Sequence, residues 1–199
     1  MINILCTKDA DELAKIHSLL REYFKSYEVV SYRDFVYYAQ NFASLYEGED
    51  YIVYKIETAA KLIGMLSCVK LNEFVLIDYL VIDVEHRCYS KEIMRQFNVI
   101  LRDFRRPIIV EAESEELCRL YRMFGFKKFN EPYKYITLRV SPDNKTSEIS
   151  AYDSNLLYLS ADEMNFEATK RIIYEKYYKR WNSKYGEELT KEYNKTLEL

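Results

Sequence analysis

The sequence predicts a mixed α/β fold, in which a central mixed sheet flanked by helices over residues 1–160 is followed by a helical C-terminal extension over residues 161–199. Short β-rich runs alternate with helix-period segments through the first 160 residues. Residues 162–199 lack a β signal and carry Ile173, Tyr177 and Trp181 at spacings of four, which indicates an amphipathic helix that docks on the domain or on a second subunit. The length of 199 residues suits one domain with an appendage, and 49% apolar residues suffice for a sizeable core.

The sequence of the first half of the chain predicts a strand, two helices and three further strands. Residues 2–6 form a short apolar run, and Asp9 is placed to cap the helix that follows. A second helix opens at Ser31 and closes near Gly48. Three β-rich runs come next, at spacings that suit antiparallel hairpins: residues 51–56, 62–71 and 74–83.

The second half begins with a strand, helix, strand order. Residues 74–83 are almost continuously apolar, which fits a central strand covered on both faces. A helix then runs up to Pro107, a strand follows at 108–111, and this order predicts a right-handed parallel crossover. Ser114 caps a short helix that ends at Gly125. Strands are expected near residues 126–129, 134–140 and 156–159, with an exposed loop or hairpin tip over the polar stretch 141–155.

Composition excludes several functional classes. The four glycines, at 48, 64, 125 and 186, cannot build a Walker P-loop or a GxGxxG fingerprint. A net charge of −3 makes nucleic acid an unsuitable partner, because phosphate backbones need a clustered basic surface. The N-terminus lacks a signal-peptide core, and no run of about 18 apolar residues exists, so we expect neither secretion nor a membrane span.

Cysteine and histidine usage predicts a reducing, cytoplasmic setting and no metal site. The four cysteines are scattered without C-x-x-C spacing, and a chain of this length does not require disulfides. Among its two histidines, only His86 lies close to a cysteine, Cys88, and one pair is too little for a zinc cluster.

Two segments then point to a family. Residues 120–126 read LYRMFGF, which resembles the Tyr-x-x-x-Gly-Phe segment of the GNAT superfamily of acyl-CoA-dependent N-acyltransferases, and the order of elements over residues 1–160 is similar to that family's. The second segment is RCYSKE, residues 87–92, where the family carries (Arg/Gln)-x-x-Gly-x-(Gly/Ala). Arg87 fits that pattern, whereas Ser90 and Glu92 replace both glycines.

The chemistry of residues 87–92 can be stated without the family. A chain that turns from a buried strand into a helix presents unpaired backbone N–H groups at the positive end of the helix dipole, which suits a pyrophosphate. Glu92 would repel that anion, and Arg87 and Lys91 could offset it. The alternative is an ordinary helix start without a ligand. The resemblance implies acetyl-CoA as co-substrate, with backbone pairing of its pantetheine arm along residues 80–82, a backbone N–H there for the oxyanion, and the following binding residues: Leu80, Val81, Ile82, Arg87, Cys88, Tyr89, Ser90, Lys91, Glu92 and Ser114.

Two residues are candidates for proton transfer. Tyr121 lies on the inward face of its helix, where a tyrosine is often simply core; the resemblance implies instead that its hydroxyl protonates the leaving thiolate. Asp78 interrupts the apolar run 74–83, so it must be hydrogen-bonded, protonated or facing a cleft. In a cleft it could take a proton from an attacking amine; alternatively it satisfies a strand bulge or pairs with an arginine.

The resemblance therefore implies an N-acetyltransferase that moves an acetyl or similar acyl group from coenzyme A to a primary amine, carried by a small molecule or a peptide. The alternative is a non-catalytic GNAT-like binding module with weakened coenzyme binding, which Glu92 and the missing glycines favour. A protein or aminoacyl-tRNA acceptor is a further alternative, against which the acidic chain argues. A second copy of the chain is a candidate partner.

Overall fold

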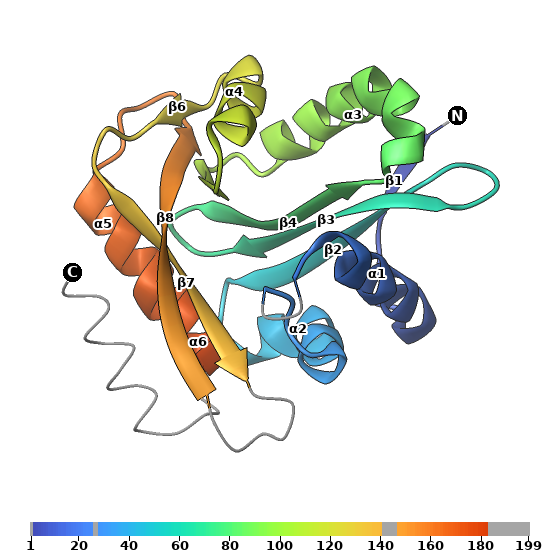
Figure 1. The fold of residues 1–199 in the computed structure, drawn as a ribbon, viewed down its shortest axis with the longest axis horizontal. Coiled ribbons are helices and arrows are strands. Elements are labelled where there is room, and N and C mark those ends of the chain that lie inside the picture. The colour runs from blue at the N-terminus through green and yellow to red at the C-terminus, as the bar shows by residue number, and fades with distance from the viewer. Residues whose placement is uncertain (1, 26–27, 141–146, 183–199) are drawn as a thin grey trace. The chain divides into compact units, whose positions relative to one another are not determined.

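The computed structural model describes residues 2–25, 28–140 and 147–182 (Figure 1). By internal contacts the chain forms two compact units, Met1–Val110 and Glu111–Leu199. This division falls after Val110, within the strand of residues Ile108–Ala112. The sequence places its boundary elsewhere, after residue 160, and that boundary stays a prediction.

The first unit is built on a mixed sheet in the order β1-β2-β3-β4-β5. The first four strands pair antiparallel, whereas β4 and β5 pair in parallel across Val75↔Ile108, as the predicted crossover requires. The elements of this unit are β1 (Asn3–Cys6), α1 (Ala10–Tyr23), α2 (Tyr32–Leu45), β2 (Asp50–Glu57), β3 (Leu62–Lys70), β4 (Val75–Ile82), the 3-10 helix η1 (Val84–Tyr89), α3 (Ser90–Asp103) and the first residues of β5 (Ile108–Ala112).

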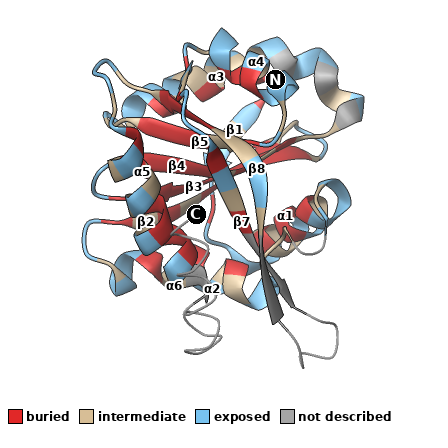
Figure 2. Cartoon of the chain, turned by 60° about the vertical axis from the view of Figure 1, so that its left-hand side comes forward, coloured by how far each residue is buried: buried red, intermediate tan, exposed pale blue. Residues whose placement is uncertain are grey.

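Local sequence signals set the helix starts of this unit. The Asp9 carboxylate accepts from the N–H of Glu12 at 2.9 Å and begins α1, and the Ser31 hydroxyl accepts from the N–H of Asp34 at 3.2 Å and begins α2. The central strands are buried, as the apolar run 74–83 predicts (Figure 2). The predicted strand–helix–helix–strand order of the N-terminal half is confirmed.

The second unit contains a long antiparallel hairpin and a C-terminal helix. Strand β7 (Tyr133–Val140) pairs along β8 (Ser147–Leu159), and β6 (Lys127–Lys128) pairs with the far end of β8. The short helix α4 (Glu115–Met123) precedes β6. The last helix has three consecutive parts: α5 (Phe166–Ile172), a π-helical turn η2 (Ile173–Tyr178) and α6 (Lys179–Asn182).

The start of β8 differs from the sequence-based expectation. The polar stretch 141–155 is predicted as a loop or hairpin tip, yet its residues 147–155 belong to β8. Pairing with β7 satisfies their backbone groups, and Tyr152 and Asp153 remain exposed, so polar side chains cost this strand little. The rest of the stretch, residues 141–146, lies outside the described residues.

The C-terminal helix packs on the rest of the second unit through aromatic side chains. Phe166 lies edge-on to Phe129 at 5.5 Å, and Tyr174 stacks on Tyr133 at 6.0 Å. Ile173 is fully buried, as its place in the predicted apolar stripe requires, and Tyr177 of that stripe is buried as well; the side chain of Trp181 lies outside the described ones. Within the described ranges, every helix is too short or too polar to cross a lipid bilayer.

Candidate functional site

Asp78 occupies a bulge in β4. The register with β3 runs Ser67↔Tyr79 and then Cys68↔Ile77, so Asp78 is the extra residue of the bulge. The fully buried side chain of Ser67, on β3, makes two hydrogen bonds to the bulge. Its Oγ accepts from the N–H of Tyr79 at 3.2 Å and donates to Asp78 Oδ2 at 3.3 Å. A bulge is one of the environments that the sequence leaves open for Asp78.

A buried phenol holds the same carboxylate. The Tyr51 hydroxyl, from β2, donates to Asp78 Oδ2 at 2.5 Å, and the Tyr51 side chain is fully buried. Burial, and then the nearby Asp78 charge, raises the pKa of Tyr51 well above its ordinary value. Tyr51 therefore stays protonated and acts as a permanent donor to Asp78. The sequence could not reveal this donor, because Tyr51 and Asp78 are 27 positions apart.

The second half of β4 runs past its partner strand. Pairing with β5 covers only Val75↔Ile108 to Ile77↔Val110, whereas β4 continues to Ile82. On its other side, β4 stays paired with β3 as far as Gly64↔Ile82. Among the described pairings of the first unit, Leu80, Val81 and Ile82 therefore have one edge that no strand covers. Such an edge can accept an extended ligand as an added strand.

The segment predicted to bind a diphosphate joins two helical turns. Residues 84–89 form η1, and α3 begins at Ser90, with a Tyr89 N-cap whose side chain makes no capping bond. Cys88, Tyr89 and Lys91 are exposed. The side chains of Arg87 and Ser90 lie outside the described ones. α3 continues directly from η1, and the exposed Lys91 ammonium in its first turn supplies the positive charge that an anionic group would need.

Glu92 carries the charge that opposes such a ligand. Its carboxylate accepts from Arg95 at 2.9 and 3.1 Å and from the Gln96 amide at 2.8 Å. The Arg95 guanidinium, followed by Gln96, lowers the pKa of Glu92 to about 2. Glu92 is therefore ionised at neutral pH, and Arg95 offsets its charge. The sequence analysis names Arg87 and Lys91 for this role; the i, i+3 spacing of Glu92 and Arg95 is the signal that it missed.

In the second unit, α4 positions Ser114 and Tyr121. Ser114 Oγ accepts from the N–H of Leu117 at 3.2 Å, which confirms the predicted cap, and Gly125 ends the helix at φ 88°. Tyr121 is buried, with its ring edge-on to Phe126 at 5.4 Å. Leu117, one turn before Tyr121 on the same helix, is exposed. The roles of Ser114 and Tyr121 toward a ligand stay predictions.

Two groups of polar side chains were not anticipated from the sequence. In the second unit, the Glu111 carboxylate accepts from the hydroxyls of Tyr133 and Tyr178, the latter at 2.6 Å, and so ties β5, β7 and the C-terminal helix together. Burial, followed by the Glu111 charge, raises the pKa of both tyrosines well above the ordinary value. No local periodicity could indicate these contacts, since the partners are 22 and 67 positions apart.

The other group, in the first unit, gathers Asp83, Glu85 and His86, with one ligand-type atom of each within 4.8 Å of the others. The Lys61 ammonium lies 3.5 Å from Asp83 and 3.8 Å from Glu85. The Lys61 ammonium thus places a positive charge beside these two carboxylates, as a metal ion would. The absence of a metal site stays a prediction.

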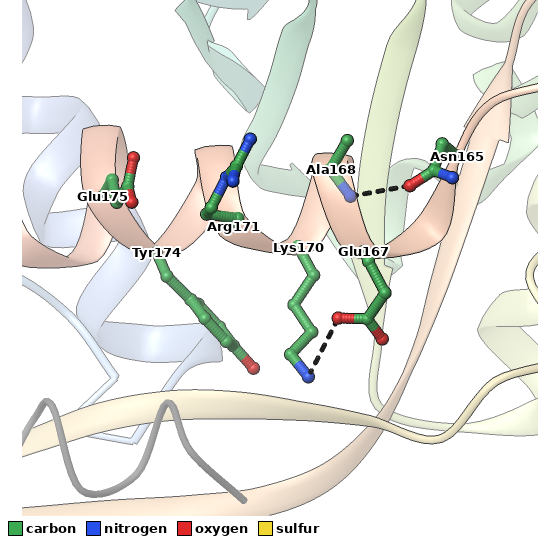
Figure 3. Close-up of a pocket in the computed structure, with 7 residues that line it drawn as sticks. All are labelled: Asn165, Glu167, Ala168, Lys170, Arg171, Tyr174 and Glu175. Atoms are coloured by element: carbon green, nitrogen blue, oxygen red, sulfur yellow. Dashed lines mark hydrogen bonds and ion pairs between the residues drawn. The ribbon is translucent and has the colours of Figure 1, made fainter.

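A hollow of about 480 Å³ lies beside the C-terminal helix (Figure 3). Its lining comes from that helix and its N-cap. Within this lining, Lys170 pairs with Glu167 at 3.8 Å, and Tyr174 donates to the Lys134 carbonyl at 3.1 Å. The predicted site residues do not line this hollow: its lining residues are Asn165, Glu167, Ala168, Lys170, Arg171, Tyr174 and Glu175.

Comparison with known proteins finds a likeness in structure. Neither a protein-family model nor a curated protein matches the sequence. The structure is similar to a Bacteroides thetaiotaomicron protein assigned to the GNAT family of acetyltransferases, with 15% identity, a TM-score of 0.66 and coverage of 87% of this chain and 96% of that chain.

Two further solved structures have named activities. Dodecameric spermidine N-acetyltransferase from Vibrio cholerae is 15% identical, with a TM-score of 0.55 and coverage of 79% and 92% of the two chains. The ribosomal-protein-S18-alanine N-acetyltransferase from Escherichia coli is 12% identical, with a TM-score of 0.54 and coverage of 83% and 100%. At such identities the likeness is one of architecture, and on that basis the chain has the fold of the GNAT acetyltransferases.

Proposed function

We propose that this chain is an acyl-CoA-dependent N-acyltransferase that transfers an acetyl or similar acyl group from coenzyme A to a primary amine. The observation that carries the proposal is the uncovered edge of β4 in a chain with the GNAT fold: β4 runs to Ile82, whereas its pairing with β5 ends at Ile77. A pantetheine arm is extended and carries amide groups, so it can pair with this edge as a strand would.

In the same proposal, residues 87–92 bind the diphosphate of coenzyme A. Support comes from the start of α3, where Lys91 is exposed and the side chain of the Tyr89 N-cap makes no capping bond. Glu92 weakens this site less than its charge alone suggests, because Arg95 binds its carboxylate. We expect the affinity for coenzyme A to be lower than a glycine-containing segment would give.

In the proposed reaction, the residues of the chain handle protons and charge. Asp78 takes a proton from the attacking amine, directly or through a water molecule, and Tyr51 and Ser67 hold its carboxylate in place. A backbone N–H of β4 stabilises the negative charge that develops on the thioester oxygen. Tyr121 donates its phenolic proton to the departing thiolate, as the family resemblance implies.

The acceptor belongs to the amines, and the neighbours suggest two kinds. One neighbour is named for spermidine and another for the alanine of ribosomal protein S18, so a small polyamine and a peptide N-terminus are both candidates for this chain. A reducing, cytoplasmic setting and a homodimer complete the proposal, and the dodecameric neighbour gives precedent for self-association within the fold.

Two measurements test the proposal in sequence. A thermal-shift titration with acetyl-CoA should raise the melting temperature progressively with ligand concentration. Release of free thiol should then depend on an added amine, in a panel of polyamines, amino acids and peptides with a free N-terminus. The absence of both a shift and thiol release would overturn the proposal.

A non-catalytic GNAT-like module is the second candidate, favoured by Glu92 and by the lack of glycine in residues 87–92. Such a module would give a weak thermal shift without amine-dependent thiol release. The pair of measurements therefore separates the two candidates.

A further inference from the structure

Asp83 links the sheet of the first unit to the segment that carries the proposed diphosphate site. It follows β4 directly and precedes η1. Its N–H donates to the Ile63 carbonyl of β3 at 2.8 Å, and its own carbonyl accepts from the N–H of His86 at 2.9 Å. The backbone of Asp83 is therefore the last part of the sheet and the first part of the helical turn.

The Asp83 carboxylate contacts three separate parts of the first unit. Tyr23, at the end of α1, donates its hydroxyl at 3.1 Å. The N–H of Glu85 donates at 3.0 Å, and His86 Nδ1 lies 3.1 Å away. The Lys61 ammonium, from the turn between β2 and β3, is 3.5 Å away. These contacts, the Glu85 N–H first, lower the pKa of Asp83, which is therefore charged at neutral pH.

The contacts continue from Asp83 into residues 87–92. The imidazole of His86, held by Asp83, stacks on the ring of Tyr89 at 6.3 Å with an interplanar angle of 14°. Tyr89 is the N-cap of α3 and makes no capping bond of its own. Residues 84–92 run through η1 directly into α3, and Asp83 accepts from the N–H groups of Glu85 and His86 at the start of this helical stretch.

We propose that Asp83 is a positioning residue for the coenzyme segment, residues 87–92: it fixes the direction in which α3 leaves the sheet and does not itself bind the ligand. This inference rests on the proposed function, because it takes the anionic part of coenzyme A as the ligand of that segment.

Whether Asp83→Asn strengthens or weakens coenzyme A binding separates a positioning role from a purely electrostatic effect. Asp83 is negative, and so is a diphosphate, so Asp83→Asn removes a repulsive charge and on electrostatic grounds alone should tighten binding. If Asp83 acts by holding the segment, the same substitution should weaken binding. Glu85→Gln is the matched control, because it removes an equal charge from an exposed side chain that is 3.8 Å from the same Lys61.

The experiment compares three full-length proteins, the wild type, Asp83→Asn and Glu85→Gln, by amide hydrogen exchange without ligand and by calorimetry with coenzyme A. We expect Asp83→Asn to speed exchange across residues 84–92 and to weaken coenzyme A binding about tenfold, which corresponds to about 1.4 kcal/mol. With an active acceptor, KM for acetyl-CoA should rise by a similar factor, whereas kcat should stay within about twofold. Glu85→Gln should leave exchange unchanged and binding equal or slightly tighter.

The outcomes distinguish the two proposals. A wild type that binds coenzyme A, together with an Asp83→Asn protein that binds equally well or better, overturns the positioning role and leaves the proposed function standing. A wild type that gives no heat with coenzyme A overturns the proposed function, and the positioning role with it. Should Asp83→Asn fail to fold, Tyr23→Phe carries the test: it keeps the charge of Asp83 and removes the hydroxyl by which α1 binds it. Unchanged exchange and affinity in that variant would reject the inference.

Discussion

Tyr51→Phe is the substitution that most sharply tests how Asp78 is held. It removes one hydroxyl from a fully buried side chain and keeps the ring that packs against Phe35 at 6.1 Å. The lost bond is 2.5 Å long and has a carboxylate acceptor. Ser67 donates to the same oxygen over a longer distance of 3.3 Å, outside the usual O–H···O range of about 2.5–3.0 Å, and so is the weaker donor. A hydrogen bond to a charged group contributes about 1.5–3 kcal/mol, so we expect the free energy of unfolding to fall by about that amount.

Urea denaturation followed by circular dichroism measures this change in the free energy of unfolding. In a separate thermal unfolding experiment, the melting temperature should fall by roughly 3–12 °C, because about 1 kcal/mol corresponds to about 2–4 °C for a chain of this size. Tyr54→Phe, on the same strand, is the control: it makes the same chemical change at a half-buried position that does not contact Asp78, and its effect should stay within about 0.5 kcal/mol. Equal stability of the two variants would refute the claim that Tyr51 holds Asp78.

The same variant tests the proposed role of Asp78 in catalysis. A donor to the charged carboxylate favours its ionised form, so its removal should make Asp78 harder to ionise. If Asp78 accepts the proton of the amine, the acidic limb of the pH–rate profile should therefore move to higher pH in Tyr51→Phe. An acidic limb at the same pH in both proteins would assign the base to another residue.

Three further substitutions test other parts of the account. Gly64→Ala would put a Cβ 2.5 Å from the facing carbonyl of β4, so we expect a loss of about 1–3 kcal/mol of stability and weaker coenzyme A binding, and unchanged urea unfolding would contradict this. Tyr178→Phe removes the 2.6 Å bond to Glu111 and should cost about 1.5–3 kcal/mol; a variant as stable as the wild type would show that the C-terminal helix docks without it. Glu92→Gln should lower the melting temperature above pH 4.5, and the difference should disappear as the pH falls towards 2, because the folded state holds Glu92 ionised beside Arg95; a difference independent of pH would reject this pairing.

Helix starts and the buried strand could be predicted because their signals are local. Asp9, Ser31 and Ser114 cap the three helices at which the sequence places them, since a capping side chain and the N–H that it binds are three positions apart. The almost continuously apolar run 74–83 contains the central strand β4, Val75–Ile82, for a similar reason: a strand covered on both faces needs apolar side chains at most successive positions.

The parts that could not be predicted depend on partners far apart in the chain. The bulge at Asp78 appears only when the register with β3 is known, and the contacts of Glu111 join residues up to 67 positions apart. The polar residues 147–155 form a strand because β7 supplies their hydrogen bonds, against the turn propensity of their own sequence. Residues 87–92 follow the strand as expected, with 87–89 in η1 and 90–92 in the first turn of α3, but the contacts of Asp83 with His86 and of Glu92 with Arg95 needed coordinates.

Product formation by the wild type and by Tyr121→Phe tests the central claim most directly. Acetylated amine would be measured by mass spectrometry, with acetyl-CoA and the best acceptor of the panel at saturating concentrations. The account predicts amine-dependent product from the wild type, and in Tyr121→Phe a kcat lower by about 10² with KM for acetyl-CoA nearly unchanged, because proton donation to the thiolate acts in the transition state. A wild type that binds acetyl-CoA but acetylates no amine, or a Tyr121→Phe variant with undiminished kcat and only a lower melting temperature, would contradict it.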